Sequence, residues 1–397
     1  KYQPEYEYKE VSMFGVNFIS CKDFPLNFSD VHAITFSECV FENNMNENWL
    51  IKLQNIQEGM ISSCLFKNNT LVPNATDTDM ITVDIQKVYL SIQETVFESQ
   101  AITDESLNCF IIKTNYNLEL SGVTILNCTC CKDSIYYTPP TESFRDSEMF
   151  SPTFTMNGCY IENSGSVIID DWTEQVTICN SIFSNSSKGL IYSPKNEAPQ
   201  FFNAAVIQFE NNVFDGLSEF ACKFSVANDI DMKNLTIKNC HNVLDDCPPI
   251  FELNILNESI CDFVFDHFTF ENNMFNNKNE ERWMNGGGNG FILNMACVKE
   301  ENKEVYLDFI GCSFISNKAE TFGGAFAFFE SKENSKGTTF LNFLNCYFKD
   351  NSCGKLQGSS LYLDVKNASI ENCVFESEFN ESIELLETGN NSTIYLH

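Results

Sequence analysis

A short pattern that returns along the whole chain is the feature that most constrains the fold. Its clearest copy, LDFIGCSFISN at 307–317, has apolar residues two apart, then a Cys, an apolar residue two after the Cys, and a closing Asn. The pattern returns at 341–351 and again, without its Asn, at 368–375. Self-similarity of this kind is typical of a repeat protein, in which each unit packs mainly on its neighbours.

We define the anchor of each copy as its last apolar residue, or whatever residue takes that place. Thirteen anchors cover the chain at a mean step of about 29 residues, within the range of solenoid repeats. The anchors are Asp23, Phe41, Phe66, Phe97, Cys130, Ile161, Phe183, Phe214, Asn242, Phe270, Phe314, Phe348 and Phe375. In nine copies a Cys stands two before the anchor: Cys21, Cys39, Cys64, Cys128, Cys159, Cys240, Cys312, Cys346 and Cys373.

The periodicity inside each copy predicts short strands joined by corners. Apolar residues two apart point to one face of a strand, and the polar pair that follows them predicts a corner. An Asn three after the anchor predicts the next corner, because Asn tolerates the left-handed backbone and bonds its own main chain. The Asn residues in this position are Asn44, Asn69, Asn273, Asn317 and Asn351.

Two or three short strands per repeat predict one coil of an all-β, single-stranded parallel β-helix, a solenoid of about 13 coils. Residues 1–10 are expected to form a cap or lead-in, and residues 11–397 a continuous β-helix. A β-sandwich with Phe-rich strands is the alternative, but it gives no reason for Cys and Phe to recur at near-fixed offsets. The 37 Phe residues suit an interior of stacked rings.

Charge excludes several classes of partner. The net charge is −31, and the chain has only two Arg residues, so neither nucleic acid nor an anionic membrane surface is an expected partner. No apolar run reaches the length of a membrane-spanning helix, so we expect no membrane insertion by this segment. The acidity is read as a soluble, self-repelling surface. Weak calcium binding is the alternative, although no EF-hand spacing is present.

Asn-x-Ser/Thr sequons indicate a secreted or cell-surface glycoprotein whose signal peptide has been removed. The predicted N-glycosylation sites are Asn27, Asn68, Asn74, Asn127, Asn185, Asn234, Asn257, Asn367, Asn380, Asn390 and Asn391.

The eighteen Cys residues fit an oxidising compartment. Positions one coil apart are within disulfide reach, so Cys21–Cys39, Cys312–Cys346 or Cys346–Cys373 could be bridged. A ladder of buried free thiols is the alternative for the nine Cys residues near the anchors. The run CTCC at 128–131 lacks a second Cys pair at zinc spacing, and no metal or other cofactor is predicted.

Two segments do not fit the coil and are predicted to project as loops, at 136–152 and at 276–290. Loops on a rigid scaffold commonly carry binding residues. The candidates here are Tyr136, Tyr137, Phe144, Arg145 and Trp283.

Short motifs in the chain resemble those of polymorphic outer-membrane (Pmp-like) repeat surface proteins. Phe-x-x-Asn occurs as FENN, FKNN, FISN or FKDN in several copies, and Gly-Gly-Ala-Phe stands at 323–326. The resemblance implies a right-handed parallel β-helix of the pectin-lyase-like kind, displayed on cell surfaces as an adhesin. Related repeats occur in surface proteins of protists, which the sequons also favour.

Two functions remain open. We expect an extracellular adhesive or structural protein, a component of a coat, filament or adhesin, whose partners are other proteins, glycans or copies of itself. The alternative is a polysaccharide lyase or glycosidase that uses Asp170–Asp171 or Asp245–Asp246, since paired carboxylates can serve as acid and base. No catalytic residue is assigned, because neither pair has a clustered basic partner in the sequence.

Overall fold

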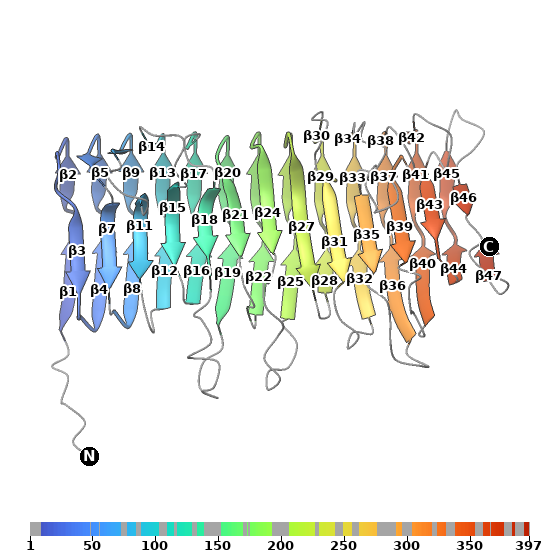
Figure 1. Cartoon of the computed structure of the whole chain (residues 1–397), viewed down its shortest axis with the longest axis horizontal. Helices are drawn as coiled ribbons and strands as arrows, with labels where there is room; N and C mark the ends of the chain where they lie inside the picture. The colour runs from blue at the N-terminus through green and yellow to red at the C-terminus, as the bar shows by residue number, and fades with distance from the viewer. Residues whose placement is uncertain are drawn as a thin grey trace, which may run out of the picture. The chain divides into compact units, whose positions relative to one another are not determined.

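The computed structural model describes residues 9–47, 49–54, 56–72, 78–84, 89–102, 109–114, 117–128, 133–138, 152–169, 173, 175–192, 206–226, 230–242, 249–255, 262–275, 291–295, 304–319, 324–330, 338–353, 360–365, 367–376, 383–385 and 393–396. In this part of the chain every regular element is a strand, and the strand pairs are parallel. The predicted all-β parallel β-helix is therefore confirmed (Figure 1).

The chain divides into two compact units, residues 1–175 and 176–397. Each coil passes in turn through a strand of sheet A, a short strand of sheet B and a strand of sheet D. Some coils add a two-residue strand, in sheet C of the first unit or sheet E of the second. The described part of the first unit holds six coils and that of the second seven, which matches the predicted thirteen. That the coils run on without a break from one unit to the next stays a prediction.

In the first unit, sheet A contains β1 (Glu10–Phe14), β4 (Ala33–Ser37), β8 (Glu58–Ser62), β12 (Tyr89–Gln93), β16 (Asn117–Ser121) and β19 (Thr153–Asn157). Sheet B contains β2 (Asn17–Ile19), β5 (Val40–Glu42), β9 (Leu65–Lys67), β13 (Val96–Glu98), β17 (Thr124–Leu126) and β20 (Tyr160–Glu162). Sheet D contains β3 (Leu26–Ser29), β7 (Trp49–Gln54), β11 (Thr78–Asp84), β15 (Cys109–Thr114), β18 (Asp133–Tyr137) and β21 (Ser166–Ile169). Sheet C contains β6 (Met45–Asn46), β10 (Thr70–Leu71) and β14 (Ala101–Ile102).

In the second unit, sheet A contains β22 (Gln175–Cys179), which begins at the boundary, β25 (Val206–Glu210), β28 (Ile230–Lys233), β32 (Asp262–Asp266), β36 (Glu304–Ile310), β40 (Thr338–Leu344), β44 (Asn367–Glu371) and β47 (Thr393–Leu396). Sheet B contains β23 (Ile182–Ser184), β26 (Val213–Asp215), β29 (Thr236–Lys238), β33 (Thr269–Glu271), β37 (Ser313–Ile315), β41 (Tyr347–Lys349) and β45 (Val374–Glu376). Sheet D contains β24 (Lys188–Tyr192), β27 (Phe220–Val226), β31 (Phe251–Ile255), β35 (Phe291–Met295), β39 (Phe326–Glu330), β43 (Leu361–Asp364) and β46 (Ile383–Leu385). Sheet E contains β30 (His241–Asn242), β34 (Met274–Phe275), β38 (Lys318–Ala319) and β42 (Ser352–Cys353).

The anchors form the middle of the sheet B strands, where one side chain per coil points inward. In the first unit the rings of Phe18, Phe41, Phe66 and Phe97 stack with centroids 4.6 to 4.9 Å apart. This distance is the spacing of neighbouring strands, so each ring lies directly over the next. The predicted interior of stacked rings is confirmed in these coils.

Three predicted anchors, Asp23, Cys130 and Asn242, are wrong by five residues. The register pairs Phe18 with Phe41, Ile125 with Phe97, and Ile237 with Phe214, so these residues are the true anchors. In these coils the Cys stands three after the anchor instead of two before it. A thiol is small and apolar enough for either buried slot, so the Cys alone did not define the register.

Twelve of the thirteen described coils turn at two residues in the left-handed conformation, on either side of the sheet B strand, and the coil of Phe375 shows the first of them. One stands three before the anchor: Gly15, Glu38, Ser63, Glu94, Gly122, Gly158, Asn180, Asn211, Asn234, His267, Gly311, Asn345 and Asn372. The other stands two after it: Ser20, Asn43, Asn68, Ser99, Asn127, Asn163, Asn185, Gly216, Asn239, Asn272, Ser316 and Asp350.

The prediction that the Asn three after the anchor makes the corner is therefore wrong by one residue. Asn317 and its equivalents are buried, and their side chains bond neighbouring coils instead of their own main chain. The residue before them makes the corner. It is exposed, so its side chain does not compete with core packing.

Candidate binding surface

The outer face of sheet A in the second unit holds the candidate site. Strands β36 and β40 have seven residues each, and every second residue is buried while those between are half-buried or exposed. The register aligns Asp308 with Asn342 and then with Ser369. Outward side chains of three consecutive coils therefore lie in rows.

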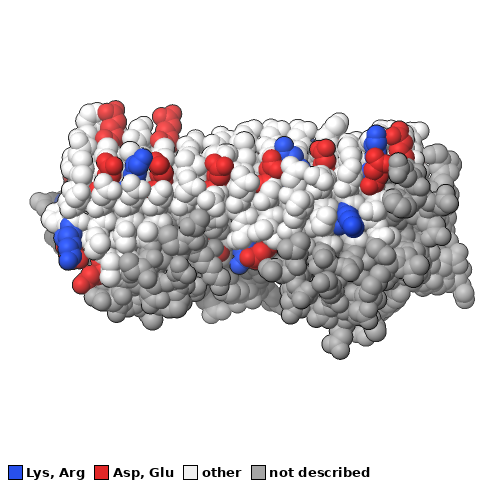
Figure 2. All heavy atoms as spheres, turned by 90° about the horizontal axis from the view of Figure 1, so that it is seen from above, with Lys and Arg blue, Asp and Glu red and all other residues white. Residues whose placement is uncertain are grey.

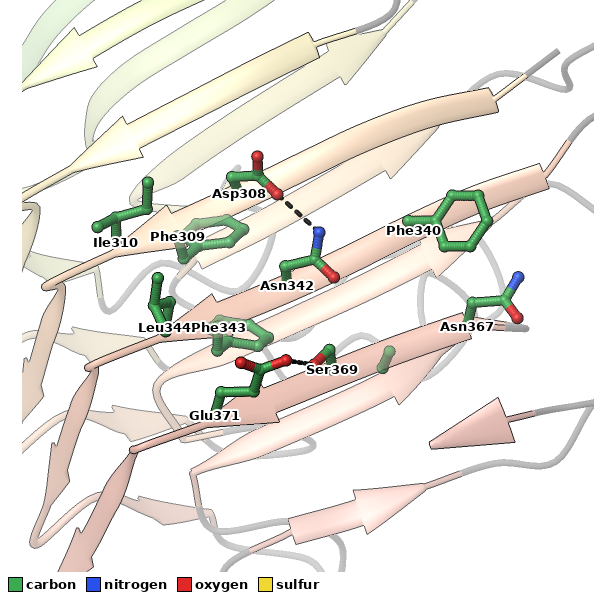
Figure 3. Close-up of a pocket in the computed structure, with 11 residues that line it drawn as sticks. Asp308, Phe309, Ile310, Phe340, Asn342, Phe343, Leu344, Asn367, Ser369 and Glu371 are labelled. Carbon is green, nitrogen blue, oxygen red and sulfur yellow. Dashed lines mark hydrogen bonds between the residues drawn. The ribbon is translucent and has the colours of Figure 1, made fainter. Parts of the chain in front are cut away.

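These rows surround a half-open depression of about 500 Å³, which we call the outer depression (Figure 3). Its size falls within the range of ligand-binding clefts. It is lined by Asp308, Phe309, Ile310, Phe340, Asn342, Phe343, Leu344, Asn367, Ala368, Ser369 and Glu371.

Two polar contacts order the middle of the outer depression. The Asn342 amide donates a hydrogen bond of 2.7 Å from Nδ2 to Oδ1 of Asp308, and the Ser369 hydroxyl donates one of 2.9 Å to Oε1 of Glu371 (Figure 3). Within the described chain neither carboxylate pairs with a Lys or Arg.

An aromatic pair borders the same face. The rings of Tyr306 and Phe340 stack across β36 and β40 with centroids 5.0 Å apart and planes at 12°. The Tyr306 hydroxyl donates to Oε2 of Glu304 at 2.6 Å, which holds the ring in place. Both aromatic side chains point outward and are only half-buried. They therefore present apolar ring surface beside the carboxylate of Asp308.

Basic side chains of the described surface are mostly neutralised by neighbours. On sheet B the ion pairs Lys67–Glu98, Lys238–Asp215 and Lys349–Glu376 have N–O distances of 3.0, 3.3 and 3.7 Å. Figure 2 shows most of the described Lys side chains on the displayed face next to acidic ones, and no cluster of several Lys side chains. Such exposed pairs contribute little stability, but they leave the acidic excess as the dominant charge.

The predicted loop residues Tyr136 and Tyr137 lie in strand β18 instead. Tyr137 is fully buried, and the Tyr136 ring stacks on Phe110 at 4.7 Å. Ile135 and Tyr137 are two residues apart and point to the same face, so the strand continues to Tyr137. The two prolines that follow made this segment look like a loop in the sequence. The other candidates, Phe144, Arg145 and Trp283, lie outside the described residues, as does most of segments 136–152 and 276–290.

The acidic pairs of the enzymatic alternative, Asp170–Asp171 and Asp245–Asp246, also lie outside the described residues. In the described part of the chain no three His, Cys, Asp or Glu side chains are grouped to hold a metal ion. The same residues contain no helix with the length and apolarity needed to cross a membrane.

The described sequon asparagines lie at the surface. Asn27, Asn68, Asn127, Asn185 and Asn234 are exposed, and Asn367 is half-buried. Four of them occupy the left-handed corners. Asn74, Asn257, Asn380, Asn390 and Asn391 lie outside the described residues. The fully buried asparagines belong to no sequon: Asn44, Asn46, Asn69, Asn212, Asn242, Asn273, Asn317 and Asn351.

The structure joins none of the nine cysteines expected near the anchors in a disulfide, and they occupy two different slots. Six stand two before the true anchor, whereas Cys21, Cys128 and Cys240 stand three after it. Cys21 aligns with Asn44, whose Oδ1 accepts a hydrogen bond from the Cys21 amide, so the suggested Cys21–Cys39 bridge does not fit the register. Bridges within Cys312, Cys346 and Cys373 stay a prediction.

Burial keeps several of these thiols protonated. It raises the pKa of Cys64 and Cys159 to about 11 and that of Cys240 to about 12. The hydrogen bond with Cys312, together with burial, raises the pKa of Cys346 to about 12. Thiols in this state are poor nucleophiles and poor metal ligands at neutral pH.

The sequence did not identify the outer depression. Asp308, Asn342 and Ser369 are spaced by 34 and 27 residues, and only the register of the coils brings them together. Strands β36 and β40 are the longest strands of sheet A, and this was the available signal, visible as extended alternation over 304–310 and 338–344. Comparison of the chain with protein-family models, with characterised proteins and with solved structures finds no match.

Proposed function

We propose that this protein is a glycosylated, secreted or cell-surface β-helical protein that acts through binding or assembly, as an adhesin or a coat or filament component. The observation that carries the proposal is the distribution of sequons. Five of the six described sequon asparagines are exposed and Asn367 is half-buried, whereas none of the fully buried asparagines lies in a sequon.

Two further features support a binding role. The coils form a rigid scaffold held by buried rings and amide ladders, which suits presentation of an outer surface. The carboxylates in the outer depression are held by an amide and a hydroxyl, an arrangement that orients them for contact. The short Phe-x-x-Asn motifs that resemble Pmp-like surface repeats are consistent with the same role.

The test uses antibodies against the folded chain on cells of the native source. We expect staining of intact cells or of secreted material, and a loss of mass after treatment with peptide-N-glycosidase. An Asn68→Gln variant should lose one glycan, whereas Asn44→Gln should keep all of them if it folds. Unglycosylated protein confined to the cytosol would contradict the proposal.

A further inference from the structure

We infer that the outer depression binds a basic segment of a partner protein, with a Lys or Arg side chain seated between Asp308 and the aromatic pair Tyr306–Phe340. This inference rests on the proposed binding function and names the chemistry of the partner. It commits to a cationic occupant because three independent properties of the described residues point to one.

The first property is charge. Among the described residues, the lining contains two carboxylates, Asp308 and Glu371, and no Lys, Arg or His. The whole chain carries a net charge of −31, so the surrounding field adds to that of the two groups. An anionic ligand would be repelled, and a cation would be drawn in and aligned.

The second property is the position of the aromatic rings. Phe340 and Asn342 both point outward from β40, two residues apart, and Asn342 bonds Asp308 on the neighbouring strand (Figure 3). A cation held by Asp308 therefore lies close to the Phe340 ring, which lines the same depression. A cation over the face of an aromatic ring is attracted to it, and the attraction strengthens as the site is desolvated.

The third property is the apolar edge. Ile310 and Leu344 are aligned on β36 and β40 and line the same depression. Lys and Arg carry long apolar stems that pack on such a surface while the charged group stays at the polar end. A site with the Asp308 carboxylate in the middle row and apolar groups at both ends thus matches an amphipathic cationic side chain.

The experiment measures binding of a fluorescein-labelled peptide of alternating Lys and Ser residues by fluorescence anisotropy at 50 mM NaCl. Its counterpart with Glu in place of Lys serves as the probe control, together with a neutral oligosaccharide. We expect the Lys peptide to bind, the Glu peptide not to bind, and binding to weaken at 500 mM NaCl.

Matched variants separate this site from the general acidic field. Asp308→Asn combined with Glu371→Gln removes two charges from the outer depression. Glu58→Gln combined with Glu119→Gln removes two from the outer face of sheet A in the first unit, where both side chains are exposed or half-buried. The first pair of substitutions should weaken peptide binding about tenfold, which corresponds to about 1.4 kcal/mol, because it removes the charges that contact the peptide. The second pair should weaken binding less than twofold.

Folding of each variant is checked by circular dichroism and urea unfolding. Asp308→Asn keeps an oxygen that can accept from Asn342. A second variant, Leu344→Lys, places a cation in the outer depression at a half-buried position and should abolish peptide binding. Equal weakening by both double variants, retained binding by Leu344→Lys, or tighter binding of the neutral oligosaccharide would overturn the inference. None of these results would affect the proposed surface location or glycosylation, because those are tested by the antibody and glycosidase experiments.

Discussion

At the scale of single residues, the buried asparagines replace main-chain bonds that the corners lack. Asn317 donates from Nδ2 to the carbonyl of Phe270 at 2.7 Å and to Oδ1 of Asn351 at 3.0 Å. Its own Oδ1 accepts from the main-chain N and from Nδ2 of Asn273, both at 3.1 Å. Because the site is shielded from water, each of these groups depends on its neighbour for a partner.

Asn317→Ala should therefore lower the free energy of unfolding by about 3 kcal/mol or more. It leaves the main-chain N–H of Asn273 buried without its acceptor and removes the side-chain bonds to Phe270 and Asn351, at about 1–3 kcal/mol for the unpaired group and about 1 kcal/mol for each lost bond. Urea unfolding followed by circular dichroism gives the change. The matched control is Asn272→Gly, an exposed left-handed corner that Gly accepts, with an expected cost below about 1 kcal/mol. Similar costs for the two variants would show that the amide ladder contributes nothing specific.

At the scale of the strands, close approach between coils decides which side chains fit. Gly189 lies in β24, and a Cβ atom there would stand 2.1 Å from the carbonyl oxygen of Ala221 and 2.9 Å from the Phe214 ring. The main chain of the next coil occupies the space that a side chain would need. A glycine in a strand commonly marks such an approach.

Gly189→Ala should destabilise the second unit by about 3 kcal/mol or prevent its folding, since the clash is with main-chain atoms. The control is Gly59→Ala, where the nearest atom is the terminal Cδ1 of Leu90 at 3.1 Å, which can move. We expect that variant to lose about 1 kcal/mol or less. Soluble yield and urea midpoint measure both. A Gly189→Ala protein as stable as its control would mean that the coils adjust their spacing freely.

At the scale of the whole molecule, the acidic excess opposes folding. The net charge is −31, so the acidic side chains repel one another in the compact state. At 0.1 M, salt screens this repulsion between charges that are more than about 10 Å apart. The described ion pairs neutralise only some of the acidic groups.

The melting temperature at pH 7 should therefore rise by several degrees between 10 and 300 mM NaCl and then level off. The same salt series at pH 4.5 is the control, because Asp and Glu titrate near pH 4 and the net charge is smaller there. Scanning calorimetry gives both series. A melting temperature that falls with salt at pH 7 would indicate that attractive ion pairs outweigh the repulsion.

Sequence reasoning predicted the coil well and the candidate site poorly. The alternation around Phe41, Phe66 and Phe314 reports burial directly, because a strand turns successive side chains to opposite faces. The same reasoning placed Tyr137 in a loop, since adjacent prolines outweighed a two-residue alternation. It also missed Asp308 and Asn342, which are ordinary polar residues of a solvated face when the chain is read alone.

The amino-acid sequence by itself determined the repeat, the strand type and which faces are apolar, because these depend on residues a few positions apart. Only the tertiary structure decided which Cys occupies which slot and which asparagines bond across coils. It also decided which outward side chains gather into the outer depression. The reason is that turns of variable length separate the copies, so alignment between coils depends on packing and hydrogen bonding between residues that are far apart in the chain.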